Sequence, residues 1–337
     1  MTIERAFVSG GSGFVGRTLL AELRRRGIRT RALVRSDDAE RVVRDAGAEP
    51  VRAGLADTDA LQRAIAGCDV VFHAAAIVTD WGDVAEFRKV NVDGTSSLLR
   101  AARAAGVRRF VHVSTEAVLA GPDPIVNADE RAAKPANPYG PYALTKSLAE
   151  DAVLAANAPG FETVVVRPRF VWGKGDTSVL PKIMAAVRAG RYRWIDSGRY
   201  LTSATHVCNL VEGLILAAER GHPGGIYFVT DGPPVEFRTF ITRMLETQGV
   251  KPSDRSLPRR LAWRLAGIVE AIWQTFRLKA PPPITRMVVK MMGEEVTLND
   301  GRARRELGYV GRVSFDQGIE AMRAAPSSGA RSGDAAR

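Results

Sequence analysis

Three glycines near the start of the chain restrict its fold more than any other feature. Gly10, Gly13 and Gly16 directly follow an apolar run at Ala6–Ser9 and open a helical pattern over Phe14–Arg26. Glycine allows a tight turn and a close approach of the backbone to an anion, and the N-terminus of a helix presents unpaired N–H groups. This order of strand, glycine loop and helix predicts the phosphate-binding turn of a dinucleotide site. The residues predicted to bind the cofactor there are Gly10, Gly13, Phe14, Val15 and Gly16.

The remainder of the first two-thirds of the chain alternates short apolar runs with helical patterns. Helices are predicted over Val84–Ala105 and Tyr139–Asn157. Strands separated by helices indicate an α/β fold with a doubly wound parallel sheet of the Rossmann type, whose strand carboxyl ends form one ligand-binding edge. The further strands are predicted at Thr30–Val34, Val70–His73, Arg109–Ser114, Thr163–Arg167 and Ile226–Thr230.

The pattern becomes less regular after Pro168, which indicates that a second unit begins there. We expect residues 1–168 and 204–230 to form the dinucleotide-binding domain. Residues 169–203 and 231–322 are expected to form a smaller, mostly helical substrate-binding lobe. Residues 323–337 are mainly small and polar, and this composition predicts a disordered tail.

The charge balance is strongly basic, with 48 Lys and Arg residues against 37 Asp and Glu residues and a net charge of +11. A basic chain can attract nucleic acid, a membrane surface or an anionic cofactor. The sequence shows neither a zinc-ligand set nor a basic low-complexity run, so we expect no nucleic-acid partner and no metal. Two cysteines indicate a reducing compartment, and neither a leader pattern nor an apolar stretch of bilayer length is evident. These features predict a cytoplasmic protein.

The end of the second predicted strand bears on the choice of cofactor. Sites for NAD often carry an acidic residue there, whereas an arginine accommodates the 2′-phosphate of NADP. Here Arg35 follows the strand directly, and Asp37 and Asp38 come later, in the next predicted helix. Arg35 therefore favours NADP(H). NAD(H) is the alternative if this arginine is only a solvated surface residue.

A tyrosine and a lysine four residues apart form the predicted catalytic pair. Tyr142 and Lys146 lie in the helical pattern after Pro141, and the i, i+4 spacing places both on one helix face. A phenol has a pKa of about 10 and needs a nearby positive charge before it exchanges a proton readily at neutral pH. The lysine ammonium supplies that charge and can hold ribose hydroxyls. The strand that ends at Ser114 and Thr115 brings a hydroxyl to the same edge of the sheet, where it could bond the substrate oxygen.

These motifs occur in the order and spacing of the extended short-chain dehydrogenase/reductases, which the chain resembles from residue 3 to about residue 322. The stretches that carry the resemblance are the glycine loop, His73–Ala76, Asn91–Thr95, Ser114–Thr115, Tyr142–Lys146 and Arg167–Pro168. The resemblance implies that Thr115, Tyr142 and Lys146 are catalytic. Gly54 stands where the family often has an aspartate. The further cofactor contacts that the resemblance implies are Leu55, Ala74, Ala75, Asn91, Ser114, Tyr142, Lys146, Pro168 and Val171.

Within that family the chain looks most like the 3β-hydroxysteroid dehydrogenase branch and the NADPH-dependent 2-alkyl-3-oxoalkanoate reductases. The resemblance implies an enzyme that interconverts a secondary alcohol and a ketone on an apolar substrate, such as a 3β-hydroxysteroid or a long 3-oxo acid. It further implies a homodimer through the helix that bears Tyr142. The similar stretches are Trp81–Gly82, Arg167–Asp176, Tyr227–Gly232 and Arg305–Tyr309.

A nucleotide-sugar epimerase of the same fold is the main alternative, because it would use the same catalytic residues. Dehydratases of the superfamily often place an Asp-Glu pair after the threonine. Here Thr115 is followed by Glu116 and Ala117, which counts against dehydration. Glu116 itself is expected to cap a helix or to face solvent. A non-enzymatic dinucleotide sensor is disfavoured, because such relatives usually lose the tyrosine or the lysine.

The pattern over Leu257–Phe276 predicts a helix with an apolar face, and soft side chains such as Met287 and Met291 follow it. An apolar lid would suit a sterol or a long acyl chain, since a sugar requires dense hydrogen bonding. Ordinary core packing is one other interpretation, and contact of a basic amphipathic helix with a membrane surface is another. The apolar positions are Leu261, Leu265, Ile268, Val269, Ile272 and Phe276, and the arginines beside them are Arg259, Arg260, Arg264 and Arg277.

Overall fold

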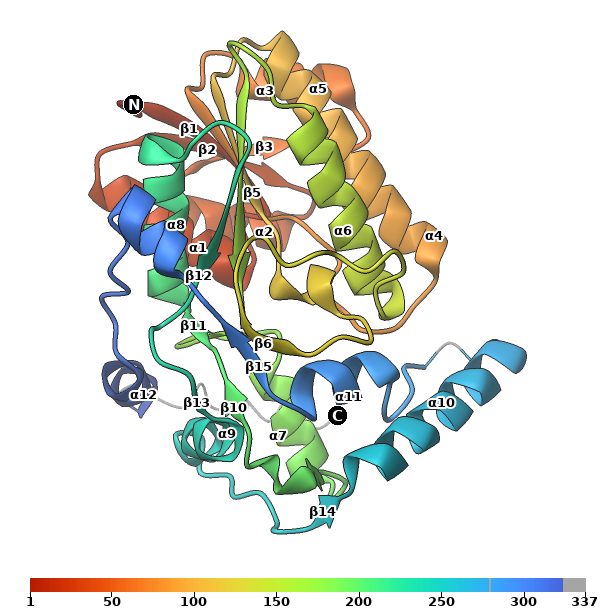
Figure 1. The fold of residues 1–337 in the computed structure, drawn as a ribbon. Helices are drawn as coiled ribbons and strands as arrows, with labels where there is room; N and C mark the ends of the chain where they lie inside the picture. The colour runs from red at the N-terminus through yellow and green to blue at the C-terminus, as the bar shows by residue number, and fades with distance from the viewer. Residues whose placement is uncertain (279, 324–337) are drawn as a thin grey trace, which may run out of the picture.

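A sheet of seven parallel strands forms the centre of the upper half of the molecule in Figure 1. The computed structural model describes residues 1–278 and 280–323. The strand order is β12-β7-β5-β4-β1-β2-β3, which confirms the predicted doubly wound fold. The order reverses between β1 and β4, so ligands are expected at the carboxyl ends of these strands. The strands are β1 (Arg5–Ser9), β2 (Arg29–Val34), β3 (Glu49–Arg52), β4 (Val70–His73), β5 (Arg109–Val113), β7 (Glu162–Pro168) and β12 (Gly225–Val229).

Helices cover both faces of this sheet (Figure 1). Successive strand residues point to opposite faces, so Val71 and Phe72 of β4 belong to two different apolar cores. The core that contains Phe72 is closed by α1 (Phe14–Arg25), α2 (Asp37–Asp45) and α8 (Val207–Arg220). The core that contains Val71 is closed by α3 (Thr58–Ile65), α5 (Gly94–Ala104) and α6 (Gly140–Ala155). The helix predicted over Val84–Ala105 is α4 (Val84–Phe87), a π-helical turn at Arg88–Asp93, and α5.

The lower part of the molecule in Figure 1 is a smaller lobe with its own apolar core. Trp172, Trp194 and Phe240 are fully buried in it. The helices packed around them are α7 (Leu180–Arg188), α9 (Phe237–Glu246) and α12 (Phe315–Arg323). Short paired strands at β8 (Val171–Trp172) with β11 (Thr205–His206), and at β9 (Trp194–Ile195) with β14 (Ser256–Leu257), lie at its margins.

This lobe also contains a four-stranded sheet that the sequence does not predict. Its strands have two to four residues, too few for an alternation of apolar and polar residues to stand out. One of them, β6, belongs by sequence to the segment 1–168 that we assigned to the dinucleotide-binding domain. The strand order is β13 (Val235–Glu236), β10 (Leu201–Thr202), β15 (Val296–Leu298) and β6 (Ile125–Ala128).

The strands of the large sheet all fall within residues 1–168 and 204–230, although the division into domains itself stays a prediction. The edge strand β3 and helix α3 were not predicted, and the central residues of β3 are only half-buried. The predicted tail, residues 323–337, lies outside the described residues apart from Arg323, which ends α12.

The helix predicted over Leu257–Phe276 forms as α10 (Arg259–Thr275), but most of its apolar stripe faces solvent. Ala262 and Ala266 pack against Val289 of α11 (Arg286–Met292). The interpretation of the stripe as core is therefore wrong for its exposed members, whereas its interpretation as a substrate lid stays a prediction. In residues 1–278 and 280–323, no helix combines the length and the apolar character needed to cross a membrane. The exposed members are Leu261, Leu265, Ile268, Ile272 and Phe276.

Candidate active site

The glycine loop forms a cradle between β1 and α1, at the point where the strand order reverses. Gly10 has a φ of 77°, and a Cβ added there would lie 2.7 Å from the backbone nitrogen of Ala75. A Cβ on Gly16 would lie 2.0 Å from the Gly10 carbonyl oxygen. Gly13 caps α1, and the N–H groups of its first turn, from Phe14 onward, have no partner within the helix. A cradle that only glycine can line, at a helix N-terminus, fits the pyrophosphate of a dinucleotide.

The loop after β4 forms the opposite wall of this cradle, with Ala74 and Ala75 close to Gly10. Asn91 holds this loop in place from the π-helical turn. Its Oδ1 accepts a hydrogen bond from the Ile77 nitrogen at 2.8 Å, and its Nδ2 donates to Thr145 Oγ1 at 3.1 Å. Both ends of the buried Asn91 amide are thus engaged by the loop and by α6. Asn91 therefore positions the cofactor wall, and its own contact with the cofactor stays a prediction.

Tyr142 and Lys146 lie one turn apart on α6, and both reach the carboxyl end of β5. Lys146 Nζ donates a hydrogen bond to the Val113 carbonyl at 2.7 Å and lies 3.1 Å from His112 Nε2. Tyr142 lies beside Thr115 and Glu116. The predicted catalytic residues Thr115, Tyr142 and Lys146 are thus brought together, as the spacing required.

Burial changes the proton affinity of both members of the pair. It lowers the pKa of Lys146 to about 7, although the carboxylate of Glu150 opposes this shift. It raises the pKa of Tyr142, the charge of Glu116 raises it further, and the Thr115 hydroxyl opposes the rise. We expected the ammonium to lower the phenol pKa, but the pKa is raised instead, and burial and the Glu116 carboxylate are the causes. A phenol with a raised pKa remains protonated at neutral pH.

A buried ion pair stands directly behind Thr115. Thr115 Oγ1 donates a hydrogen bond to Glu116 Oε2 at 2.7 Å, and Arg169 donates to Glu116 Oε1 at 2.6 Å. Arg169 also bonds the Met291 carbonyl of α11, so the pair joins the sheet to the lobe. The expectation that Glu116 caps a helix or faces solvent is wrong, since its side chain is only 6% exposed. Arg169, which directly follows the last residue of β7, supplies the opposite charge that stabilises Glu116 in this buried position.

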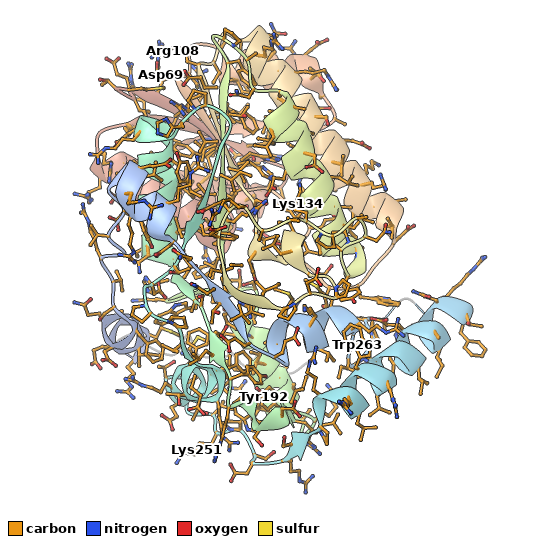
Figure 2. All side chains as sticks on the ribbon, in the orientation of Figure 1. Asp69, Arg108, Lys134, Tyr192, Lys251 and Trp263 are labelled. Atoms are coloured by element: carbon orange, nitrogen blue, oxygen red, sulfur yellow. The ribbon has the colours of Figure 1, made fainter. Side chains whose placement is uncertain are left out.

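A second buried ion pair holds Ser114. Ser114 Oγ donates to Glu150 Oε2 at 2.7 Å, and Arg167 donates to both oxygens of the same carboxylate, at 2.9 and 2.5 Å. Lys134, labelled in Figure 2, lies 3.3 Å from Glu150. Burial raises the pKa of Glu150, but the bonds and charge of Arg167 prevail and lower it overall. The Ser114 hydroxyl is thus committed to Glu150, and a cofactor contact of Ser114 stays a prediction.

The remaining predicted cofactor residues lie at or just beyond the carboxyl ends of their strands. Arg35 follows β2 and is exposed, Pro168 ends β7, and Val171 begins β8. Leu55 follows β3 and packs over Gly94, where a Cβ would lie 3.1 Å from its Cδ1. Asp37 and Asp38 begin α2 and are engaged by arginines, Asp37 by Arg52 and Asp38 by Arg41.

Apolar side chains surround the catalytic tyrosine on the side of the lobe. Met287 and Met291 of α11 belong to one cluster with Tyr139 and Tyr142, and both methionines are buried. A Cβ on Gly140 would lie 3.4 Å from Met287, so α11 packs closely on the start of α6. The methionines that follow the predicted helix thus lie near the reacting group, unlike the apolar stripe of α10.

Sequence reasoning missed the partners of these groups, namely Glu150, Arg167, Arg169 and His112. A charged residue on an apolar helix or strand was the available signal. Glu150 lies on the buried face of α6, and Arg167 and Arg169 flank Pro168 within an otherwise apolar run. Such residues are rarely buried without a partner, which suggests that each has an opposite charge nearby.

Residues 7–259 match the 3-beta hydroxysteroid dehydrogenase/isomerase family. The chain belongs to this family. Members of it are short-chain dehydrogenases, and the chain is accordingly an NAD(P)-dependent oxidoreductase, which agrees with the cradle and with the tyrosine and lysine at the strand edge.

Three similar proteins span almost the whole chain. A 4-hydroxy-2-methyl-3-oxo-4-farnesyl-3,4-dihydroquinoline-1-oxide ketoreductase of Stigmatella aurantiaca is 51% identical over 96% of this chain and 97% of its own. A 2-alkyl-3-oxoalkanoate reductase of Stenotrophomonas maltophilia is 34% identical over 95% and 98%. The crystal structure of gox2253 has a TM-score of 0.76 and 28% identity over 95% and 98% of the two chains. These matches confirm the resemblance stated from the motifs.

Proposed function

We propose that the protein uses NADPH to reduce a ketone on an apolar, lipid-like substrate, with Tyr142 as the proton donor. The observation that carries this proposal is the position of Tyr142, which lies beside Thr115 and in one apolar cluster with the buried Met287 and Met291. A raised pKa keeps the phenol protonated, which is the form that ketone reduction requires of Tyr142. The reducing direction is proposed because the two relatives named above are a ketoreductase and a reductase.

The chain's own residues have the following roles in this proposal. The nicotinamide, when bound, supplies the hydride. Tyr142 donates its proton to the substrate oxygen, and Thr115, which already donates to Glu116, accepts a hydrogen bond from the hydroxyl so formed. Lys146 holds the cofactor ribose, and its ammonium, anchored on the Val113 carbonyl, stabilises the phenolate that Tyr142 leaves behind.

The preference for NADPH rests on the surroundings of Arg35. This side chain is exposed at the end of β2. The three carboxylates in the first turn of α2, which could repel a 2′-phosphate, are each paired with an arginine, namely Asp37 with Arg52, Asp38 with Arg41, and Glu40 with Arg44 and Arg52. Ser36 caps α2 there and accepts a hydrogen bond from the Ala39 nitrogen at 3.2 Å. A free guanidinium and a helix N-terminus together favour an anion at this position.

The substrate class follows from the apolar cluster and from the relatives. The two reductases named above act, by their names, on a farnesyl-substituted quinoline oxide and on 2-alkyl-3-oxoalkanoates. Both names describe a ketone next to a long or bulky hydrocarbon. A site lined by methionines adapts to such irregular apolar shapes. Prenylated bicyclic ketones, 3-oxo acids with long 2-alkyl chains and 3-ketosteroids are therefore the substrates to test.

The test is a spectrophotometric screen of these ketones and of nucleotide sugars with NADPH and with NADH. We expect net oxidation of NADPH with at least one apolar ketone and none with the sugars. A nucleotide-sugar epimerase would convert its substrate without a net change in nicotinamide absorbance. Such a result, with no ketone turned over, would refute the proposal.

We further propose a homodimer through α6 and a cytoplasmic location, as the family resemblance implies. Two cysteines in the chain, Cys68 and Cys208, form no disulfide, which agrees with a reducing compartment. Light scattering on the purified chain would give its mass in solution, and a monomeric mass would refute the dimer.

A further inference from the structure

An exposed apolar stripe runs along α10, on the side away from the body of the protein. Ile268 is 58% exposed and Phe276 is 70% exposed, and Leu278 continues the stripe past the end of the helix. The spacing of the exposed positions brings them onto one face of an α-helix. Figure 1 shows α10 extending beyond α11 at the lower edge of the molecule. The full set is Leu261, Leu265, Ile268, Ile272, Phe276 and Leu278, here called the α10 stripe.

The opposite face of α10 is fully used inside the protein. Ala262 and Ala266 are buried against α11, and Trp263, labelled in Figure 2, packs its ring 5.2 Å from that of Tyr139. A Cβ on Gly267 would lie 2.3 Å from the Arg286 guanidinium, so α10 sits close to its support. The inner face of α10 is therefore fixed by Ala262, Ala266 and Trp263, and the α10 stripe stays exposed.

The charges beside the stripe are positive. Arg260 and Arg264 lie one turn apart, and Arg264 is three residues from Leu261 and four from Ile268, so these arginines border the stripe. Arg260, Arg264 and Arg277 are exposed, and none has a carboxylate within 4.0 Å among the described residues. The two nearby acids are engaged elsewhere, Glu270 with the Arg286 backbone nitrogen at 2.7 Å and Glu294 with Lys290 at 2.6 Å.

An apolar stripe bordered by unpaired arginines matches the boundary of an anionic lipid bilayer, where acyl chains lie beneath negative headgroups. We propose that α10 docks this protein on the surface of anionic membranes, with the α10 stripe inserted and Arg260, Arg264 and Arg277 among the headgroups. This goes beyond the proposed reaction and does not depend on it. The net charge of +11 adds a long-range attraction to the same surface.

Two other occupants fit the observations less well. Residues 324–337 contain no large apolar residue, so that segment has nothing with which to cover the stripe. A second copy paired on the same face would bring two sets of these arginines together, and like charges oppose such a contact. The contact of Trp263 with Tyr139, the residue before α6, links the docking helix to the neighbourhood of Tyr142.

The test is sedimentation of the purified full-length chain with phosphatidylglycerol vesicles and with phosphatidylcholine vesicles. We expect binding to the anionic vesicles that weakens as salt is added, and little binding to the neutral ones. Leu265→Asp combined with Ile268→Asp should abolish binding. Replacing Arg260, Arg264 and Arg277 by glutamine should weaken it by about a hundredfold at low salt. Val310→Asp is the matched control, because Val310 is 58% exposed, like Ile268, but lies elsewhere.

Three results would overturn the proposal. The first is a wild-type chain that stays in solution with phosphatidylglycerol vesicles at low salt. The second is equal binding by the wild type and the Leu265→Asp, Ile268→Asp variant. The third is a dimer in solution that this variant converts to a monomer, since the stripe would then be an interface between copies. None of these measurements uses turnover, so a failure here is separate from a failure of the proposed reaction.

Discussion

The carboxyl end of β5 and the outer face of α10 arrange their charges in opposite ways. At β5, Glu116 and Glu150 are buried, and each is held by an arginine and by one of two successive hydroxyls. Along α10, Arg260 and Arg264 are exposed and have no carboxylate partner among the described residues, and the apolar stripe is uncovered. The buried ion pairs at β5 stabilise the folded chain. The exposed groups of α10 make no such contacts and remain able to interact with another molecule.

This difference predicts which substitutions affect the chemistry, which affect folding and which affect neither. A side chain with buried partners cannot be removed without leaving another group unsatisfied. Removing an exposed side chain that has no partner leaves no buried group unsatisfied. The five predictions below use this rule and run from the largest expected effect to the smallest.

The largest effect is expected at the proton donor. Tyr142→Phe removes the hydroxyl and leaves the ring, so kcat on a ketone substrate should fall by about a thousandfold, within the usual range for a general acid. Steady-state kinetics at saturating NADPH would measure the loss. Tyr192→Phe is the matched control in the lobe, labelled in Figure 2, and should keep nearly full activity. Full activity in Tyr142→Phe would show that Tyr142 is not the proton donor.

Two adjacent residues of α10 separate the buried face from the exposed one. Ala266→Asp places a charge without a partner against Val289, so the free energy of unfolding should fall by roughly 3 kcal/mol. Leu265→Asp, one residue earlier, should change it by no more than about 0.5 kcal/mol. Urea denaturation of both variants would measure the two values. Similar losses in both would mean that the α10 stripe is not exposed in solution.

The low pKa of Lys146 predicts a pH dependence of stability. The folded pKa of about 7 lies below the ordinary value of 10.5, so the unfolded chain binds more protons between these pH values and stability rises with pH. From pH 7 to pH 9 the gain should be about 2 kcal/mol. Chemical denaturation of the wild type and of Lys146→Met at both pH values would isolate the contribution of Lys146. Only the wild type should show this gain in the free energy of unfolding. Parallel curves would contradict a buried, easily deprotonated lysine.

The negative charge of Glu116 should raise the pKa of Tyr142. Glu116→Gln keeps the shape and removes the negative charge beside Tyr142, so the phenol pKa should fall. The pH profile of alcohol oxidation should then move to lower pH by roughly one unit. A change that is purely structural would lower the rate without moving the profile, and that outcome would leave Glu116 with a packing role only.

The smallest effect is expected at Arg35, which is exposed like the arginines of α10. Arg35→Ala should weaken NADPH binding by about tenfold and leave NADH binding unchanged, because one charge contact to the 2′-phosphate is lost. Fluorescence titration with both cofactors would measure the two affinities, and thermal unfolding should be unaltered. Equal affinities for NADPH and NADH in the wild type would refute the cofactor preference.

The large sheet and the catalytic residues could be predicted from sequence because each depends on local order. Gly10 to Gly16 follow a strand directly, and Tyr142 and Lys146 share one helix face. The small sheet could not be predicted, since β6 and β15 pair across more than a hundred and fifty residues and are only a few residues long. The α10 stripe shows the limit most clearly, because helical spacing identifies a face but not what covers it. The same reasoning missed Arg169, whose partner Glu116 comes from another strand end.

The seam between α10 and α11 has an evolutionary consequence. Its closest contacts come from Ala262, Ala266 and Gly267, small residues that lie on one side of the helix. The outward positions can therefore drift freely without disturbing the reaction centre. A few substitutions on the exposed face of α10 could therefore change the surface on which the protein docks, while the catalytic residues stay the same.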